Sequence, residues 1–209
     1  MSAKESNFYP DLAVTIDRAL SLTIASERKE TLQVLIDYIQ TKYDQGQELH
    51  LNFICTHNSR RSHFAQIWAQ TAAFYYGVKG TFYSGGVEVT EFNKNAVAAI
   101  QRSGFHISSE GTINPKYQVD FSNQREPILA FSKMFNGPIN AIERFAAVLV
   151  CSAAEERCPY IIGAEQRILI QYEDPKIFDG TAQEIAGYDE RSMQIASEMF
   201  YVFQNITRL

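Results

Sequence analysis

The chain has 209 residues, 45% of them hydrophobic and 21% charged, which is enough apolar material for one domain with a sizeable core. Its formal net charge of -5, without a dense run of Lys and Arg, argues against a nucleic-acid partner, because phosphate contacts need clustered basic side chains. No apolar run approaches the ~20 residues that cross a bilayer. The N-terminal sequence also lacks the layout of a secretory signal, so we expect a cytoplasmic protein without a membrane partner.

Residues 1–48 are predicted to form a helical extension. Ser26 is the predicted N-cap of its main helix, and Gly46 offers a stop. Between them, apolar residues recur at helical spacing: Leu32, Leu35, Ile36 and Ile39. This pattern indicates a helix that packs on the rest of the domain.

Strands and helices then alternate along the chain. An apolar run ends at Cys55, and a short polar loop leads into a helix. Further strands are predicted at 80–89, 146–153 and 167–172, with helices at 93–104 and at the C-terminus. Alternation of this kind indicates an α/β fold with a mainly parallel sheet, in which ligands bind at the carboxyl ends of the strands. Prolines interrupt residues 112–144, which we interpret as an insertion within a single catalytic domain spanning 1–209.

The loop after the first strand has the spacing of an anion-binding site. Cys55 and Arg61 frame a C-x5-R segment, and its other members are Thr56, His57, Asn58, Ser59 and Arg60, with Ser62 immediately after. Backbone N–H groups in such a loop, together with a helix N-terminus, can cradle a tetrahedral oxyanion. The guanidinium of Arg61 suits two oxygens of phosphate or arsenate. The same electrostatic field favours the thiolate form of a cysteine.

The alternative for Cys55 is a small buried residue at a strand end, the commoner fate of a lone cysteine. One Cys and one Arg at this spacing would not outweigh that alternative. The preceding strand and the following helix do outweigh it, because anion binding by loop amides and stabilisation of a thiolate both require a helix N-terminus next to the loop. We therefore predict that Cys55 is a nucleophile.

With these features, "CTHNSRRS" resembles the phosphate-binding loop of low-molecular-weight protein tyrosine phosphatases and of thioredoxin-coupled arsenate reductases, which share a fold. The resemblance implies a three-layer αβα domain with a mainly parallel four-stranded sheet. A second match is "YEDP", residues 172–175. In that family the Asp of the Asp-Pro pair is the general acid, which points to Asp174 here.

The other two cysteines favour the reductase branch. Cys151 and Cys158 form a Cys-x6-Cys-Pro segment, which the thioredoxin-dependent reductases carry and the phosphatases do not need. The resemblance implies a relay in which Cys151 attacks Cys55, Cys158 then attacks Cys151, and thioredoxin reduces the resulting disulfide. A zinc site is disfavoured because paired ligands are usually two to four residues apart, and we predict no metal. A structural role for both thiols remains the alternative.

The resemblance thus predicts an arsenate reductase, with a phosphatase acting on phosphotyrosine or other phosphomonoesters as the alternative. Its partners would be an arsenate or phosphate oxyanion and thioredoxin, and no bound cofactor is expected. Two residues depart from the family pattern. Gln66 stands where the reductases place a Glu that helps to bind potassium, which puts a monovalent-cation site in doubt, and Arg60 adds a second positive charge at the pocket rim. A non-catalytic oxyanion-binding module is the third alternative.

Overall fold

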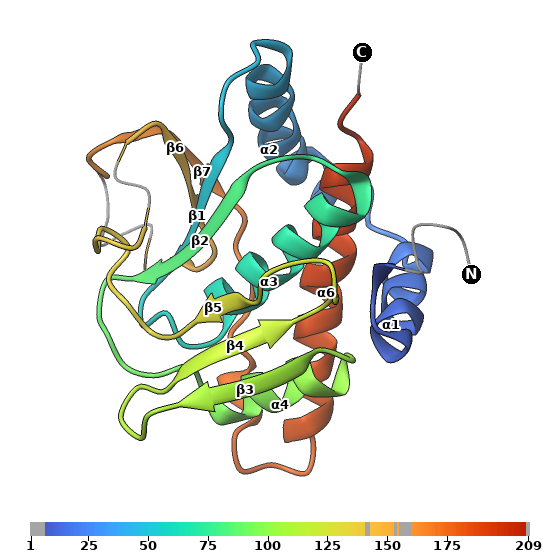
Figure 1. Cartoon of the computed structure of the whole chain (residues 1–209), viewed down its shortest axis with the longest axis vertical. Helices are drawn as coiled ribbons and strands as arrows, with labels where there is room; N and C mark the ends of the chain where they lie inside the picture. Colours follow the sequence, from blue (N-terminus) through green and yellow to red (C-terminus); the bar gives the residue numbers. More distant parts are fainter. Residues whose placement is uncertain (1–6, 141–142, 153, 155–159, 208–209) are drawn as a thin grey trace.

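The computed structural model describes residues 7–140, 143–152, 154 and 160–207. Its centre is a parallel sheet of four strands in the order β2-β1-β6-β7 (Figure 1). The strands are β1 (His50–Cys55), β2 (Thr81–Gly86), β6 (Phe145–Leu149) and β7 (Ala164–Leu169). The prediction of an α/β fold with a mainly parallel four-stranded sheet is confirmed.

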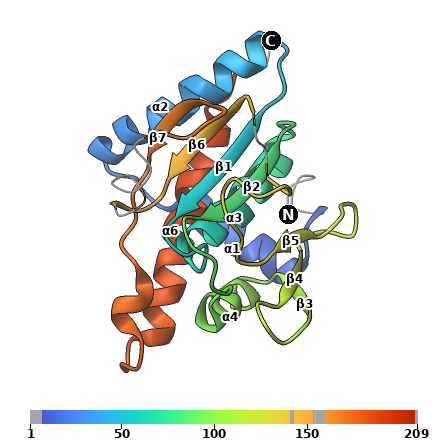
Figure 2. The same ribbon diagram turned by 90° about the vertical axis from the view of Figure 1, so that its left-hand side faces the viewer.

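Burial explains why these segments form the sheet. All five residues of β6 are buried, as are all residues of β1 after His50, which is the pattern of strands covered on both faces. Helices α3 (Arg61–Tyr76) and α6 (Glu184–Gln204) lie behind the sheet in the view of Figure 2. The indole of Trp68, fully buried on α3, donates a 3.0 Å hydrogen bond to Ser192 Oγ on α6, which satisfies the polar atom of this core side chain.

The connections create a crevice at one edge of the sheet. After β1 the chain adds β2 on one side, and it later returns to add β6 on the other side of β1. Ligands of open α/β sheets bind at such a switch point, outside the carboxyl ends of the strands. Cys55 is the last residue of β1, and Cys151 closely follows the end of β6. The topology therefore brings these two cysteines to the same edge.

The N-terminal segment is helical, as predicted. Helices α1 (Pro10–Ser21) and α2 (Ser26–Asp44) both contact α6, and α2 also contacts β7. Arg28 on α2 donates two hydrogen bonds, of 2.9 and 2.7 Å, to the buried carboxylate of Glu198 on α6. The predicted cap is wrong by one residue: Ala25 is the N-cap, without a side-chain hydrogen bond, and Ser26 is already helical.

A second sheet lies at the other end of the molecule from α2, as Figures 1 and 2 both show. It follows α4 (Lys94–Arg102) and contains β3 (His106–Glu110), β4 (Lys116–Asp120) and β5 (Ile128–Ala130), in antiparallel pairing. The predicted insertion, 112–144, includes β4 and β5 but omits β3. Strand β3 was missed because none of its side chains is buried, so its sequence lacks an apolar pattern.

Two other features complete the description. The last strand was predicted at 167–172, but β7 begins and ends earlier, since at this edge of the sheet only alternate side chains turn inward. A short 3-10 helix, η2 (Pro175–Phe178), joins β7 to α6. In the described ranges, every helix is too short or too polar to span a bilayer.

Candidate functional site

The C-x5-R loop is held open by hydrogen bonds to its carbonyl groups. Four of these carbonyls accept hydrogen bonds of 2.8 to 3.3 Å from residues outside the loop: those of Cys55, Thr56, His57 and Ser59. Asn58 has a φ of 45°, a left-handed conformation that Asn tolerates better than most residues. The outward turn of the carbonyls directs the intervening N–H groups toward the inside of the loop.

Those N–H groups are free to bind an anion. Among the described residues, none of the amides of residues 56–61 donates a hydrogen bond to another part of the chain. Helix α3 begins at the end of the loop, its N-cap residue Arg60 makes no side-chain cap, and its first turn contains no acidic residue. Unsatisfied donors at a helix N-terminus attract anions. The loop therefore has the geometry of an oxyanion cradle.

The thiol of Cys55 lies in a buried hydrogen-bonded group. Its Sγ is 3.1 Å from Ser62 Oγ, and Asn58 Nδ2 donates a 2.9 Å hydrogen bond to the same oxygen. Because Ser62 accepts from Asn58, its own proton is available to the sulfur. Cys55 is only 4% exposed, so attack on a substrate must occur inside the loop.

Gly86, at the end of β2, allows the loop to approach the sheet. A Cβ atom there would lie 2.7 Å from Asn58 N and 2.6 Å from Glu88 O, both backbone atoms that cannot move aside cheaply. Replacing Gly86 by Ala should weaken inorganic phosphate binding about tenfold or more, since overpacking costs about 1–3 kcal/mol. Isothermal titration calorimetry would measure this. In the control, Gly80→Ala, the Cβ meets only the Leu49 and Phe82 side chains, so equal losses in both variants would contradict the argument.

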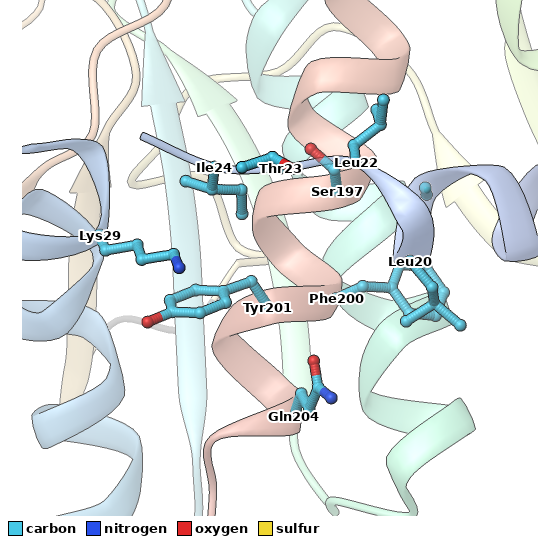
Figure 3. A pocket seen from close by; sticks show the side chains of 10 residues that line it. Leu20, Leu22, Thr23, Ile24, Lys29, Ser197, Phe200, Tyr201 and Gln204 are labelled. Carbon is cyan, nitrogen blue, oxygen red and sulfur yellow. The ribbon is translucent and has the colours of Figure 1, made fainter. Parts of the chain in front are cut away.

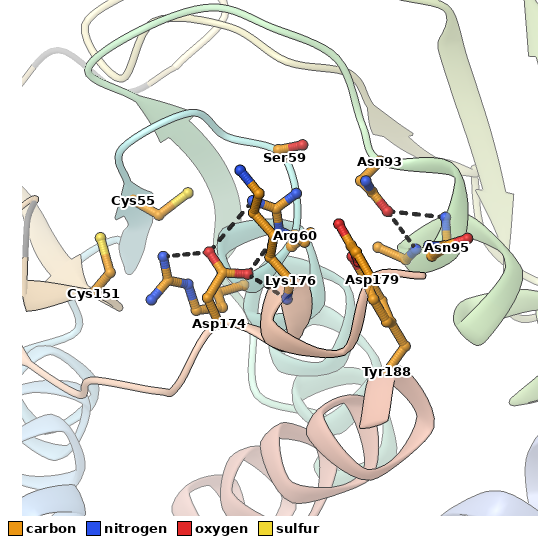
Figure 4. A network of polar contacts seen from close by, with 12 residues as sticks. Cys55, Ser59, Arg60, Asn93, Asn95, Cys151, Asp174, Lys176, Asp179 and Tyr188 are labelled. Carbon is orange, nitrogen blue, oxygen red and sulfur yellow. Dashed lines mark hydrogen bonds and ion pairs between the residues drawn. The ribbon is translucent and has the colours of Figure 1, made fainter. Parts of the chain in front are cut away.

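Asp174 shares the pocket with the loop, as Figure 4 shows. Its carboxylate accepts a 2.7 Å hydrogen bond from Arg60 Nε and lies 2.9 Å from Arg61 Nη2. Arg61 also donates a 3.0 Å hydrogen bond to the carbonyl of Tyr172, and Lys176 N donates to Asp174. One carboxylate of the chain thus pairs with both guanidinium groups, and the three side chains together keep a net positive charge.

This pairing sets the charge of Asp174. Burial by itself would raise the pKa of Asp174, but the charge of Arg61 and the hydrogen bond from Arg60 hold it below its usual value. Asp174 is therefore ionised at neutral pH while it is paired with the two arginines. To act as an acid it must gain a proton when an oxyanion replaces it on the guanidinium groups. Arg60 brings the predicted second positive charge to the pocket, where its side chain is 12% exposed and bound to Asp174.

The pocket suits a small polar ligand. Its cavity volume is only about 10 Å³, and it is lined by Cys55, His57, Ser59, Arg60, Arg61 and Asp174. No Phe, Tyr or Trp side chain of the inserted segment lines it: Phe121, for example, packs on Phe8 and Phe74 in the core. His57 is half exposed and lies 3.5 Å from the Glu88 carboxylate at the rim.

The inserted segment supports the loop from behind. Ser132 Oγ donates a 2.8 Å hydrogen bond to the carbonyl of His57, and Lys133 N donates a 3.0 Å hydrogen bond to Asn58 Oδ1. Thr90 Oγ1 adds a further contact to His57 O. These supporting residues were missed from the sequence, which carries no local signal for contacts between segments so far apart.

Cys151 lies beside the loop. Its thiol is buried and 3.6 Å from Thr56 Oγ1, and Figure 4 shows it next to Cys55 at the neighbouring strand end. Neither thiol is in a disulfide. The predicted partner Cys158 lies outside the described residues. The structure thus brings together Cys55, Arg61, Asp174 and Cys151.

No other described site competes with this one. Gln66, in place of the cation-binding Glu, donates a 3.0 Å hydrogen bond to the carbonyl of Phe82. Within the described ranges, no cluster of three or more His, Cys, Asp or Glu side chains could hold a metal ion. A separate pocket between the α1–α2 connection and α6 has Lys29 over the ring of Tyr201 and contains no loop residue (Figure 3).

Known proteins resemble the chain in sequence and in structure. No protein-family model matches it. The chain is 29% identical to an arsenate reductase of Bacillus subtilis over 139 residues, which is 66% of this chain and 83% of the relative. It is 27% identical to an arsenate reductase of Bacillus licheniformis, again over 66% of this chain and 83% of the relative.

A solved structure shows the same fold. The low-molecular-weight phosphotyrosine phosphatase of Vibrio cholerae O395 superposes with a TM-score of 0.53 and 16% identity. The superposition covers 75% of this chain and 95% of the phosphatase. The part of this chain outside the superposition is consistent with elements added to a common fold.

Proposed function

Because the chain has the low-molecular-weight phosphotyrosine phosphatase fold and is distantly homologous to arsenate reductases, we propose that it is an arsenate reductase regenerated by thioredoxin. One observation carries the proposal: a buried thiol inside an amide-lined loop, beside a second buried thiol at the next strand end. A nucleophile and a resolving thiol must be neighbours if the second is to displace the product from the first.

The first step forms a bond between sulfur and arsenic. The Cys55 thiolate attacks arsenate held by the loop amides and Arg61, and a hydroxyl group leaves arsenic as water with a proton from Asp174. Arsenic is still in its +5 state in this adduct. The loop stabilises the negative charge on the arsenate oxygens throughout.

The second step reduces arsenic. The Cys151 thiolate attacks the sulfur of Cys55, a disulfide forms, and the electron pair of the sulfur–arsenic bond passes to arsenic, which leaves as arsenite. Cys158 then attacks Cys151 and releases the Cys55 thiolate. The dithiol of thioredoxin reduces the Cys151–Cys158 disulfide and supplies the two electrons of the cycle.

A phosphatase is the second candidate, since the solved phosphatase shares the fold and the pocket here contains a cysteine, an arginine and an aspartate. Water would complete its second step, and Cys151 and Cys158 would have no part in it. The small pocket without an aromatic lining favours a compact oxyanion over an aryl phosphate.

The test compares the two activities in single-cysteine variants. Cys151→Ser and Cys158→Ser should each lose multiple-turnover arsenite production with thioredoxin, thioredoxin reductase and NADPH, by about 10³-fold or more. Both variants should keep any hydrolysis of p-nitrophenyl phosphate, because Cys55 is the only one of the three cysteines that this reaction needs. Arsenate turnover at the parent rate in either variant would refute the relay. Inertness of the parent toward both substrates would instead support a binding module.

A further inference from the structure

Lys133 lies directly behind the oxyanion loop and has no part in the chemistry above. It follows β5 in the inserted segment and is 9% exposed. Its backbone N donates to Asn58 Oδ1 at 3.0 Å, and its carbonyl accepts a 2.8 Å hydrogen bond from Gly86 N. The backbone of Lys133 is thus bound both to the loop and to the end of β2.

The ammonium group of Lys133 contacts only neutral groups among the described residues. Its Nζ donates to Ser84 Oγ at 3.3 Å and to the carbonyl of Phe131 at 3.4 Å, and it lies 5.0 Å from the centre of the Phe131 ring. None of the ion pairs between described residues includes Lys133. Burial lowers the pKa of Lys133 to about 8, so the ammonium is still largely protonated at neutral pH.

The nearest titratable group does not compensate this charge. His63, on the first turns of α3, is fully buried and lies 3.3 Å from Ser84 Oγ. Burial, and then the positive charge of Lys133, hold the pKa of His63 well below its usual value, so the imidazole is neutral. The structure therefore places one uncompensated positive charge beneath the loop.

A buried cation without a carboxylate partner destabilises a fold unless anions elsewhere offset it. The loop that the Lys133 backbone contacts contains the Cys55 thiol and the amide cradle, where negative charge appears when the thiolate forms and an oxyanion binds. We propose that the Lys133 ammonium is a built-in cation that stabilises the anions formed and bound in the oxyanion loop, while the Lys133 backbone holds the loop. The inference rests on the proposed oxyanion site and adds a positioning residue to it.

The expected size of the effect follows from Coulomb's law. At an illustrative separation of about 10 Å and an effective dielectric constant of about 20, two unit charges interact strongly enough to change anion affinity roughly tenfold. A merely structural role for the side chain predicts no such change. Because the tether to Asn58 uses the backbone of Lys133, it survives replacement of the side chain.

The experiment uses Lys133→Met, a neutral side chain of similar length. Inorganic phosphate binding to the full chain should weaken roughly tenfold by calorimetry. Alkylation of Cys55 by iodoacetamide at neutral pH should slow several-fold, measured with Cys151 and Cys158 replaced by serine. The melting temperature should stay the same or rise, since an apolar isostere removes a desolvated charge.

A matched control is available in Lys42, which is 7% exposed on α2 and lies 2.6 Å from the Glu165 carboxylate, remote from the loop. Lys42→Met should lower stability and leave phosphate affinity unchanged. In Lys133→Ala, where the side-chain volume is vacated, ammonium ions should restore phosphate affinity and tetramethylammonium should not.

Three results would overturn the inference: parent-like phosphate affinity in Lys133→Met, an equal loss in Lys42→Met, or equal responses of Lys133→Ala to the two ammonium salts. Failure of the proposed function is a different result, because then the parent itself would not bind phosphate or arsenate. The parent measurement therefore separates the two failures.

Discussion

Replacing Cys55 by serine should lower turnover of arsenate, and of p-nitrophenyl phosphate, by about 10⁴-fold or more while inorganic phosphate still binds. The hydroxyl of serine keeps the volume and the hydrogen bond to Ser62 but is a far weaker nucleophile at neutral pH than a thiolate. The anion is held by loop amides and Arg61, which the substitution does not touch. Steady-state assays and calorimetry on the same preparation would measure both effects.

The control for this variant is Cys151→Ser, at the neighbouring strand end. It should keep phosphate binding and any phosphatase activity and lose only thioredoxin-dependent arsenate turnover. A Cys55→Ser protein that retained either activity would show that Cys55 is not the nucleophile. If Cys55→Ser also lost phosphate binding, the thiolate would have a second role. Its charge would be needed to order the loop that binds the anion.

Asp174→Asn should have two opposite effects, a decrease in turnover by about 10²–10⁴-fold and an increase in phosphate affinity. Turnover falls because asparagine cannot protonate the leaving oxygen. Affinity rises because the Asp174 carboxylate, which pairs with Arg60 and Arg61, no longer competes with the ligand for their guanidinium groups. Glu173→Gln is the matched control, since its exposed carboxylate lies next to Asp174 in sequence and pairs with Arg191 instead.

The same substitution should change the response to acid. Because the folded protein holds the pKa of Asp174 below 3.8, its ion pairs stabilise the fold above that pH and are lost as the pH falls through the folded-state value. Acid unfolding should therefore be steeper in the parent than in Asp174→Asn. Unchanged phosphate affinity together with parallel acid unfolding curves would contradict the idea that Asp174 competes with the anion for Arg60 and Arg61.

The central sheet could be predicted because its strands are buried runs of apolar residues. Segments such as Phe145–Leu149 carry no polar side chain, so their local composition predicts a buried strand of a parallel sheet. Strand β3 could not be predicted in this way. Its five residues are partly or fully exposed, and it pairs with β4 through backbone hydrogen bonds, which leave no pattern in the side chains.

The candidate site also has a part that local sequence predicts and a part that it does not. The spacing of Cys55, Arg61 and Ser62, between a strand and a helix, determined the anion-binding loop from the sequence, because amide geometry in such a loop depends on residues close together in the chain. The roles assigned to Cys151, Cys158 and Asp174 came from resemblance, and their catalytic roles stay predictions.

Only the tertiary structure decided how the loop is supported and charged. The contact of Arg60 with Asp174 joins positions that are 114 residues apart, and the hydrogen bond from Lys133 to Asn58 joins positions 75 apart. Such contacts depend on where the sheet places distant segments, so neither the paired arginines nor the buried ammonium could be inferred from spacing. The sequence determined which groups line the loop, and folding determined which charges face one another, because electrostatic interaction depends on distance in space and on exclusion of water.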